Sequence, residues 1–416
     1  MKETIPEDWE SVPLGEHCYI KARIGWRGLK ASEYTSEGAC LIANKHLTLY
    51  GVDWRLCDHI SEFRYEESPE IQLQKDDIVM SKDGTIGQVS YIDKLPGKAT
   101  INSTMMLLRS NKETINSRYL FYFLQGSDFK LFLYQKNSGS SIPHIFQRDM
   151  VNLSVTCPPL PEQKRIAEVL STIDNAIQRA DEVINGTERL KQGLMQKLLT
   201  EGIGHTEFID SPVGEIPKKW DVVQLKDISL RTHLTDPRKA KDKEFQYVDI
   251  SSIDNIAFSI VSWNTITGQN APSRARKVIQ TGDILFATTR PYLKNIAIVP
   301  SSLNGEVCST GFCVIRANTS ETTTEWIYHN VLTPQFLTKI KVKMKGATYP
   351  AVSDKDVMNV TIAKPMLEEQ KRISEILSTV DRKSDLERER KSRLERIKLG
   401  LMNDLLTGRK RVNVGG

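Results

Sequence analysis

The chain has 416 residues, of which 39% are hydrophobic and 26% are charged, and its net charge is +5. This is the composition of a folded protein too long for one ordinary core, so we expect two or three domains. No stretch approaches the ~20 apolar residues of a membrane helix, and the N-terminus has no signal-peptide core. The six cysteines contain no C-x-x-C pair, which indicates reduced thiols in a cytoplasmic protein and excludes disulfide scaffolds and zinc fingers.

The first half of the chain predicts a mixed domain that leads into a long helix. Asp83-Gly84-Thr85 forms a turn between two strand-like segments. A helix follows, and its apolar spacing continues to Phe129 and Phe132. In chain order, the predicted elements are strands at 77–80 and 88–92, a helix at 118–124, a strand at 153–155 and a helix at 162–200.

The second half repeats the first. Residues 162–200 and 369–407 align without a gap, and 20 of the 39 aligned positions are identical. Shorter matches extend the repeat upstream, at offsets between 206 and 211 residues. Residues 15–73 and 226–279, in contrast, share almost nothing. We therefore interpret the chain as a duplicated framework that carries two different surfaces.

The repeat predicts an α+β fold with two mixed α/β globular domains. Two long antiparallel helices that form a coiled coil separate these domains, in an internal duplication with a pseudo-two-fold arrangement. Gly202 and Gly408 follow the helices closely and are suited to end them. The predicted segments are a first globular domain (1–158), a long helix (159–202), a linker (203–213), a second globular domain (214–365), a second long helix (366–409) and a C-terminal tail (410–416).

Both long helices carry an apolar stripe at heptad spacing, which calls for another helix beside it. Packing on its own domain is the simpler interpretation of a single stripe, but two matched stripes favour antiparallel pairing of the helices with each other. The second stripe has a charged middle between Arg382 and Arg393. The residues predicted to pair are Ile166, Leu170, Ile173, Ile177, Leu194, Leu198, Ile373, Leu377, Val380, Leu394, Leu401 and Leu405.

The sequence contains no catalytic constellation. It lacks both phosphate-binding patterns, G-x-x-x-x-G-K-[ST] and G-x-G-x-x-G. Thr289-Arg290-Pro291-Tyr292 loosely resembles the N/D-P-P-Y/F signature of amino-methyltransferases but lacks its Asn or Asp. Cys57-Asp58-His59 and the Cys308, Cys313 pair fit no metal template. We therefore expect no catalytic residue, no metal site and no cofactor bound by this chain.

Basic and small polar residues recur in corresponding loops of the two globular domains. Lys and Arg contact phosphates irrespective of sequence, and Arg, Lys, Gln, Asn and Thr can also read base edges. For any single loop, an ordinary solvated turn remains the simpler interpretation. The candidate DNA-binding residues are Arg23, Arg27, Lys82, Thr85, Gln88, Lys136, Ser138, Ser140, Arg274, Arg276, Thr289, Arg290, Lys294, Lys343 and Lys345.

Four motifs carry a family resemblance: PPLPEQKRIA at 158–167, its echo at 365–373, GLMQKLLT at 193–200 and GEIPKKW at 214–220. On these motifs the whole chain resembles the specificity (S) subunit of type I restriction-modification enzymes. The resemblance implies that each globular domain is a target recognition domain that reads one half of a split, asymmetric DNA sequence. It also supports DNA binding by the candidate residues as a group. The recognition loops differ among family members, so the resemblance assigns no individual DNA contact.

The resemblance further implies that this chain binds double-stranded DNA and partner subunits. The paired helices dock two modification subunits, which bind S-adenosylmethionine and methylate adenine N6. Restriction subunits, which use ATP and Mg, complete a complex for defence against foreign DNA. A 39-residue helix spans roughly 58 Å, so such a pair can hold two domains about one ~34–36 Å turn of DNA apart.

Two other classes of function remain open from the residues alone. One is a duplicated, non-catalytic scaffold or adaptor that binds protein or RNA through its globular domains. It predicts no salt-dependent affinity for DNA. The other is an active methyltransferase, which predicts that the isolated chain binds S-adenosylmethionine.

Overall fold

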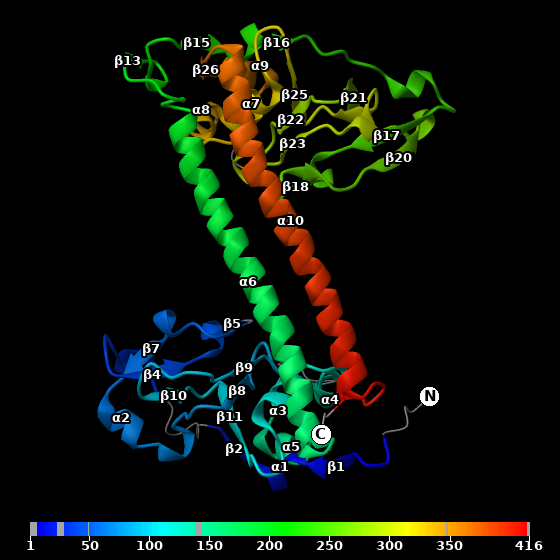
Figure 1. Cartoon of the computed structure of the whole chain (residues 1–416). Helices are drawn as coiled ribbons and strands as arrows, with labels where there is room; N and C mark the ends of the chain where they lie inside the picture. Colours follow the sequence, from blue (N-terminus) through cyan, green and yellow to red (C-terminus); the bar gives the residue numbers. More distant parts are fainter. Residues whose placement is uncertain (1–5, 23–28, 49, 138–143, 347, 414–416) are drawn as a thin grey trace. The chain divides into compact units, whose positions relative to one another are not determined.

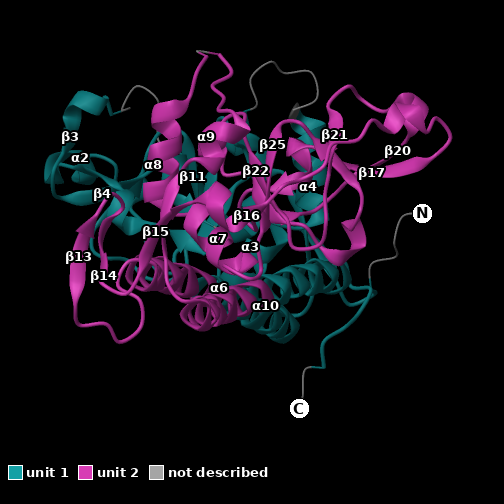
Figure 2. Ribbon diagram, turned by 90° about the horizontal axis from the view of Figure 1, so that it is seen from above, with its two compact units in different colours: residues 1–182, 387–416 teal, residues 183–386 magenta. Residues whose placement is uncertain are grey.

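The structure is a computed structural model in which the chain forms two compact units (Figure 1, Figure 2). Unit 1 comprises Met1–Glu182 and Glu387–Gly416, and unit 2 comprises Val183–Leu386. Each unit therefore combines one globular domain with part of each long helix. The residues that the structure describes are 6–22, 29–48, 50–137, 144–346 and 348–413.

Unit 1 contains two four-stranded sheets, in the orders β2-β11-β8-β9 and β10-β4-β7-β3. Alternate side chains of β8 enter two cores, because Ile78 and Met80 join a core with the long helices and Val79 joins a core between the sheets. Burial of both faces explains the continuous apolar run of this strand. The strands of unit 1 are β1 (Glu10–Pro13), β2 (Cys18–Ala22), β3 (Tyr34–Thr35), β4 (Ala39–Ile42), β5 (Leu47–Thr48), β6 (Gly51–Val52), β7 (Asp58–Ile60), β8 (Ile78–Ser81), β9 (Val89–Tyr91), β10 (Ala99–Ile101), β11 (Met105–Ser110) and β12 (Ser154–Cys157).

Unit 2 repeats the first of these sheets in the order β16-β25-β22-β23, and it adds a second sheet in the order β20-β17-β24-β21. An ion pair with a buried aspartate recurs at the two central strands of the shared sheet, since Asp283 binds Arg316 at 2.7 Å as Asp77 binds Arg109 at 2.7 Å. The duplication is therefore a duplication of structure. The strands of unit 2 are β13 (Phe208–Ser211), β14 (Gly214–Pro217), β15 (Asp221–Gln224), β16 (Ser229–Leu230), β17 (Glu244–Val248), β18 (Ile253–Asp254), β19 (Ser259–Ile260), β20 (Asn264–Thr267), β21 (Ala275–Val278), β22 (Ile284–Ala287), β23 (Ile296–Ile298), β24 (Val307–Ser309), β25 (Phe312–Ala317) and β26 (Thr361–Lys364).

The predicted helix at 118–124 is confirmed as α3, but it does not continue to Phe129 and Phe132. Those residues belong to a separate helix, α4, and Gly126 lies between the two. Glycine has a low helix propensity, which accounts for the break. The short helices are α1 (Leu14–His17), α2 (Glu62–Glu66), α3 (Ser117–Phe123), α4 (Ser127–Asn137), α5 (Gln147–Val151), α7 (Thr324–Val331), α8 (Pro334–Lys343) and α9 (Asp354–Met358).

The two long helices are α6 (Leu160–Leu198) and α10 (Leu367–Leu406). Gly202 and Gly408 follow them with φ of +67° and +76°, a left-handed conformation in which glycine is favoured. The sequence prediction of two helix stops is confirmed at both positions. Among the described residues, no helix combines the length and the apolar character that crossing a bilayer requires. All six cysteines are free and buried, as expected for reduced thiols.

The apolar stripes serve both of the packing roles that the sequence left as alternatives. In unit 1, Ile166 and Leu170 of α6 share a core with Leu405 of α10 and with the first domain. In unit 2, Leu198 of α6 and Leu377 of α10 share a core with the second domain. Each stripe therefore packs against the other helix and against a domain at its ends. The predicted pairing residues that are only partly buried are Ile173, Leu194, Val380, Leu394 and Leu401.

Candidate nucleic-acid interface

A repeated Gln at the start of each long helix fixes that helix to its domain. In unit 1 the buried side chain of Gln163 accepts a hydrogen bond from the backbone N–H of Asn116 at 2.8 Å. Its amide donates to the carbonyl oxygens of Thr114 and Pro158 at 3.1 and 2.9 Å. Both donors and the acceptor of the amide are used, so the domain and the helix are held at a fixed angle within the unit. In unit 2, Gln370 makes the equivalent bonds to Glu321, Thr322, Thr323 and Pro365.

The neighbouring Glu ties the start of one long helix to the end of the other. In unit 1 the buried Glu162 pairs at 2.6 Å with Arg411, which follows α10, and Arg411 also binds Asp8 at 2.7 Å. In unit 2, Glu369 takes the same position at the start of α10. The groups that donate to it are the backbone N–H of Ile203 at 2.9 Å, Nε2 of His205 at 2.8 Å and Nε1 of Trp220 at 3.1 Å.

Charged side chains bridge the two long helices away from their ends. Lys398 pairs with Asp174 at 2.7 Å in unit 1, and Lys191 pairs with Asp381 at 2.5 Å in unit 2. These are the same pair in the two copies, because the repeat aligns the two aspartates and the two lysines. The predicted apolar seam did not include this pair. Its signal was present as two identical polar positions within the repeat.

A third bridge is restricted to unit 1. Lys391 pairs with Asp181 at 2.7 Å, and the hydroxyl of Tyr50, between β5 and β6, donates to the same carboxylate. The repeat places Ile184 and Arg388 at the corresponding positions, so the second copy cannot form this lysine–aspartate pair. Within unit 1, residues unique to the first domain thus contact the long helices directly.

His329 of α7 is the least satisfied polar side chain near the long helices. It is 1% exposed, and within the described residues neither ring nitrogen has a hydrogen-bond partner. Burial, together with the nearby Lys191 charge, lowers the pKa of His329 to about 3. The repeat places Tyr122 at this position in unit 1, where its hydroxyl donates to Asp174 at 2.8 Å.

We expect His329 to make the stability of the protein fall as the pH is lowered from 6.5 toward 3. The unfolded chain binds a proton at the ordinary pKa of 6.5, whereas the folded chain keeps the imidazole neutral down to about pH 3. The loss amounts to about 2 kcal/mol between pH 8 and pH 5. Urea denaturation at both pH values should show that His329→Phe removes this loss. The exposed His233 gives the control His233→Phe, and equal pH dependence in both variants would contradict the prediction.

In unit 1, acidic neighbours neutralise the two lysines predicted to contact DNA. Lys82 pairs with Asp83 at 3.0 Å, and its side chain keeps only 14% of its exposure. Asp83 also binds His144, and although burial raises the pKa of Asp83, its bonds to Lys82 and His144 hold that pKa below its usual range. Lys136 pairs with Asp149 at 3.2 Å. Neither lysine is therefore a free charge in unit 1.

The remaining candidates of unit 1 differ in their exposure. Thr85 is exposed at the turn after β8, whereas Gln88 is half-buried and donates to the carbonyl oxygen of Leu47 at 3.4 Å. Gln88 therefore stabilises the hairpin formed by β5 and β6. The candidates Arg23, Arg27, Ser138 and Ser140 lie outside the described residues.

In unit 2, the loop after β22 contacts the segment that joins α8 to α9. Thr289 and Ala351 form an isolated bridge, and the backbone N–H of Arg290 donates to the carbonyl oxygen of Pro350 at 2.8 Å. The guanidinium carbon of Arg290 lies 4.8 Å from the ring centroid of Tyr349. Within this unit, α7 lies next to the long helices and α9 lies on the far side of the domain from them (Figure 2).

The other candidates of unit 2 are spread around this loop pair. Arg276 of β21 pairs with Asp236 at 2.8 Å, so its charge is compensated. Lys294 is half-buried. The candidates Arg274, Lys343 and Lys345 are exposed. The sequence prediction thus contains paired and unpaired cations, and only the structure separates them.

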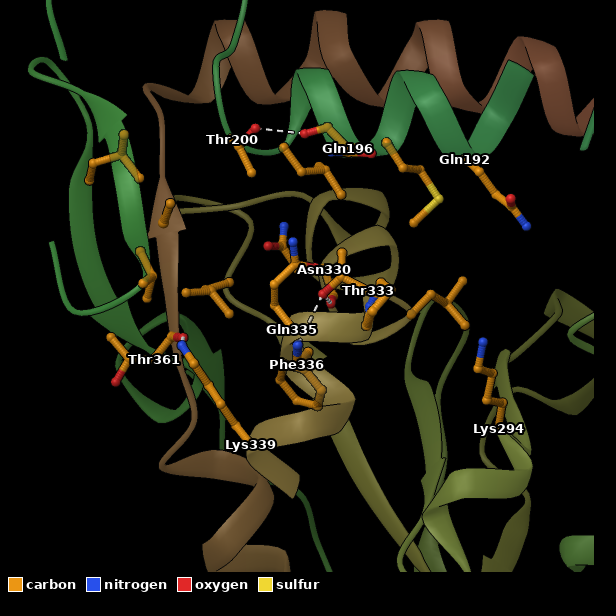
Figure 3. A pocket seen from close by; sticks show the side chains of 18 residues that line it. Gln192, Gln196, Thr200, Lys294, Asn330, Thr333, Gln335, Phe336, Lys339 and Thr361 are labelled. Atoms are coloured by element: carbon orange, nitrogen blue, oxygen red, sulfur yellow. Dashed lines mark hydrogen bonds between the residues drawn. The ribbon is translucent and has the colours of Figure 1, made fainter. Parts of the chain in front are cut away.

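Unit 2 also holds a cavity of about 440 Å³ between the end of α6, the turn from α7 to α8, and β26 (Figure 3). The ammonium of Lys339 donates to the carbonyl oxygen of Thr361 at 3.1 Å, and burial lowers the pKa of Lys339. The repeat places Phe132 at this position, where it stacks on Phe129 in unit 1. The cavity therefore coincides with the exchange of an aromatic side chain for a lysine, and Lys294 is the one DNA-binding candidate in its lining.

Comparison with known proteins decides between the functional classes. Residues 6–185 and 217–396 match the family described as "Type I restriction modification DNA specificity domain". The chain belongs to this specificity family. The two matched segments are the two halves of the repeat, so the predicted resemblance and the internal duplication are both confirmed.

Full-length relatives agree with this assignment. The type I restriction enzyme MjaVIII specificity subunit of Methanocaldococcus jannaschii is 28% identical over 98% of this chain and 94% of its own length. The putative type I restriction enzyme MjaX specificity subunit of the same organism is 29% identical over 98% of this chain and 95% of its own. The crystal structure of the S subunit of a type I restriction-modification system from M. genitalium has the same fold, with a TM-score of 0.58, 15% identity, and coverage of 97% of this chain and 98% of that chain.

Membership of the specificity family supports the prediction that the chain is not an enzyme, because specificity subunits are the non-catalytic part of these systems. Within the described ranges, no three His, Cys, Asp or Glu side chains gather as a metal ion would require.

Proposed function

We propose that this chain is the DNA-recognition subunit of a type I restriction-modification complex and binds an interrupted, asymmetric target with one globular domain per half-site. The observation that carries the proposal is a shared framework with two unlike surfaces. The sheets β2-β11-β8-β9 and β16-β25-β22-β23 have the same order. Residues 15–73 and 226–279 differ almost completely. Two recognition domains with different surfaces fit a target whose two half-sites differ.

The long helices supply docking surfaces for partner subunits in this proposal. The two modification subunits bind along the helices and carry S-adenosylmethionine, while the restriction subunits carry ATP and Mg, all in the cytoplasm. Exposed aliphatic side chains on both helices support this role, because they give a partner subunit apolar surface to bury. These residues are Val183 and Leu190 of α6 and Ile376, Leu386, Ile397 and Leu399 of α10.

Methylation mapping tests the proposal. The chain is reconstituted with the modification subunit of its own system and incubated with S-adenosylmethionine and a randomised DNA library. We expect methylated adenines only within one interrupted motif, formed by two specified blocks and a spacer without base preference. Affinity for this motif should fall steeply with salt. A scaffold of the alternative class would yield no motif and no salt-dependent DNA binding.

We also expect the isolated chain neither to bind S-adenosylmethionine nor to cleave DNA. The physical reason is that it has no phosphate-cradling or cofactor-binding motif and leaves the chemistry to its partners. Calorimetry with S-adenosylmethionine measures this, with the modification subunit as the positive control. Stoichiometric binding of S-adenosylmethionine to the isolated chain would contradict this prediction and favour an active methyltransferase.

A further inference from the structure

The cations of the recognition loops differ in whether they have an acidic partner. Lys82, Lys136 and Arg276 each bind a carboxylate of their own unit, at 3.0, 3.2 and 2.8 Å. Arg290, in contrast, has no carboxylate partner among the described residues. A cation already paired within the protein must break that pair before it contacts DNA, whereas Arg290 has no such pair to break.

The backbone at Arg290 is unusual for a residue with a side chain. Its φ is +48° and its ψ is +54°, which is a left-handed conformation. Lys294, at the other end of the same turn, has a φ of +57°. Only four non-glycine residues in the described part of the chain have positive φ, and these two flank one turn of three residues. L-residues are strained in this region, and such strain tends to gather at functional sites.

The first copy has glycines at the corresponding positions. Strands β8 and β22 align at an offset of 206 residues, which places Gly84 opposite Arg290. Strands β9 and β23 align at an offset of 207, which places Gly87 opposite Lys294. Gly84 and Gly87 have φ of +72° and +76°. Both copies thus share a left-handed turn that suits glycine, and the second copy has introduced two cations there at the cost of backbone strain.

Neighbouring groups hold the guanidinium of Arg290 in place. It stacks on the exposed ring of Tyr349, and its Nη2 donates to the carbonyl oxygen of Thr348 at 3.4 Å. Its Nε is buried without an acceptor in the described structure. Nη1 likewise has no acceptor among the described residues. The fork is therefore oriented and retains free donors, which favours planar, bidentate recognition over a diffuse phosphate contact.

We propose that Arg290 reads a guanine in the half-site of the second domain, with Tyr349 as the residue that positions it. Two parallel N–H donors match O6 and N7 of guanine in the major groove, and no other base presents that pair of acceptors. The inference rests on the proposed function, because it assumes that this loop faces DNA. Gly84 has no side chain for this contact, so the first domain should not read a guanine from this position.

The test uses Arg290→Gly, which introduces the residue of the first copy at a position where glycine is unstrained. This variant should melt no lower than the parent chain, so a loss of recognition cannot be attributed to unfolding. Lys294→Gly is the matched control, since it relieves the same kind of strain and removes the same charge. Tyr349→Phe keeps the ring, and Tyr349→Ala removes it.

Each variant is reconstituted with the modification subunit, and methylation is mapped on a DNA library. With Arg290→Gly we expect preference for guanine to fall about 10- to 100-fold at one position of one block, with all other positions unchanged. Tyr349→Ala should weaken the same position and Tyr349→Phe should preserve it. Lys294→Gly removes a cation that can contact phosphate, so it should weaken methylation of all sequences alike without changing the preference at any one position. For Arg290→Gly, unchanged preference, or an equal loss on every sequence, would overturn the guanine assignment. If the parent chain itself yields no interrupted motif, the proposed function has failed instead.

Discussion

Leu405→Asp should lower the free energy of unfolding by about 3–5 kcal/mol and loosen unit 1, although Leu405 lies at the far end of the sequence from the first domain. The side chain is buried in the core that also contains Ile166, Leu170 and Met106. The substitution removes this packing and places a carboxylate in an apolar core. Hydrogen exchange should rise in β11 of unit 1, and urea denaturation should give the free energy.

Leu399→Asp is the control for this experiment. Leu399 lies on the same helix but is 59% exposed, so the charge stays in water. We expect a change within about 0.5 kcal/mol. If both variants behaved alike, the end of α10 would not belong to the core of the first domain.

Glu369→Ala should cost about 2–4 kcal/mol, because it leaves three donors without their acceptor. The backbone N–H of Ile203, the imidazole of His205 and the indole of Trp220 all donate to this carboxylate. Buried donors that lose their partner each carry a desolvation penalty. Thermal and urea denaturation of the purified chain would measure the loss.

Two substitutions set the scale for that measurement. Glu369→Gln keeps an acceptor oxygen and should fall between the parent and the alanine variant. Glu368→Ala alters the adjacent residue, whose side chain is 83% exposed and pairs with Lys371 one turn away, so it should change stability by less than about 0.5 kcal/mol. Equal losses of stability for the alanine variants at 368 and 369 would contradict the role of Glu369 in joining the start of α10 to the segment after α6.

The repeat made most of the fold predictable from the sequence. A gapless alignment of two long helices is a strong signal, because an apolar stripe at heptad spacing has few other structural meanings. The break between α3 and α4 was missed, since the spacing of Phe129 suited one continuous helix and the effect of Gly126 was overlooked. The sequence could not show whether each stripe packs on the other long helix or on a globular domain, because residue spacing predicts which face is buried but not which element covers it.

The recognition surface was much less predictable than the fold. The sequence placed Arg290 and Lys345 in loops of the second domain that correspond to those of Lys82 and Lys136 in the first. All four cations were therefore predicted equally as DNA contacts. The acidic partners of the two lysines in the first domain, Asp83 and Asp149, carry no pattern that distinguishes a paired from an unpaired cation. The left-handed turn that Arg290 shares with Gly84 appears only when the φ angles of the two copies are compared. Recognition loops follow no periodicity, so tertiary contacts are needed to rank their residues.

The central claim, that each globular domain reads its own half of the target, is tested most directly by exchanging one domain. Strands β15 and β26 pair with each other at the entry and exit of the second domain, so residues 221–364 can be replaced by the equivalent segment of another member of the specificity family. The hybrid is reconstituted with the modification subunit, and its methylated adenines are mapped beside those of the parent chain. We predict that one block of the motif changes to the donor's sequence, while the other block and the spacer length stay the same. A change in both blocks, or in neither, would contradict the account.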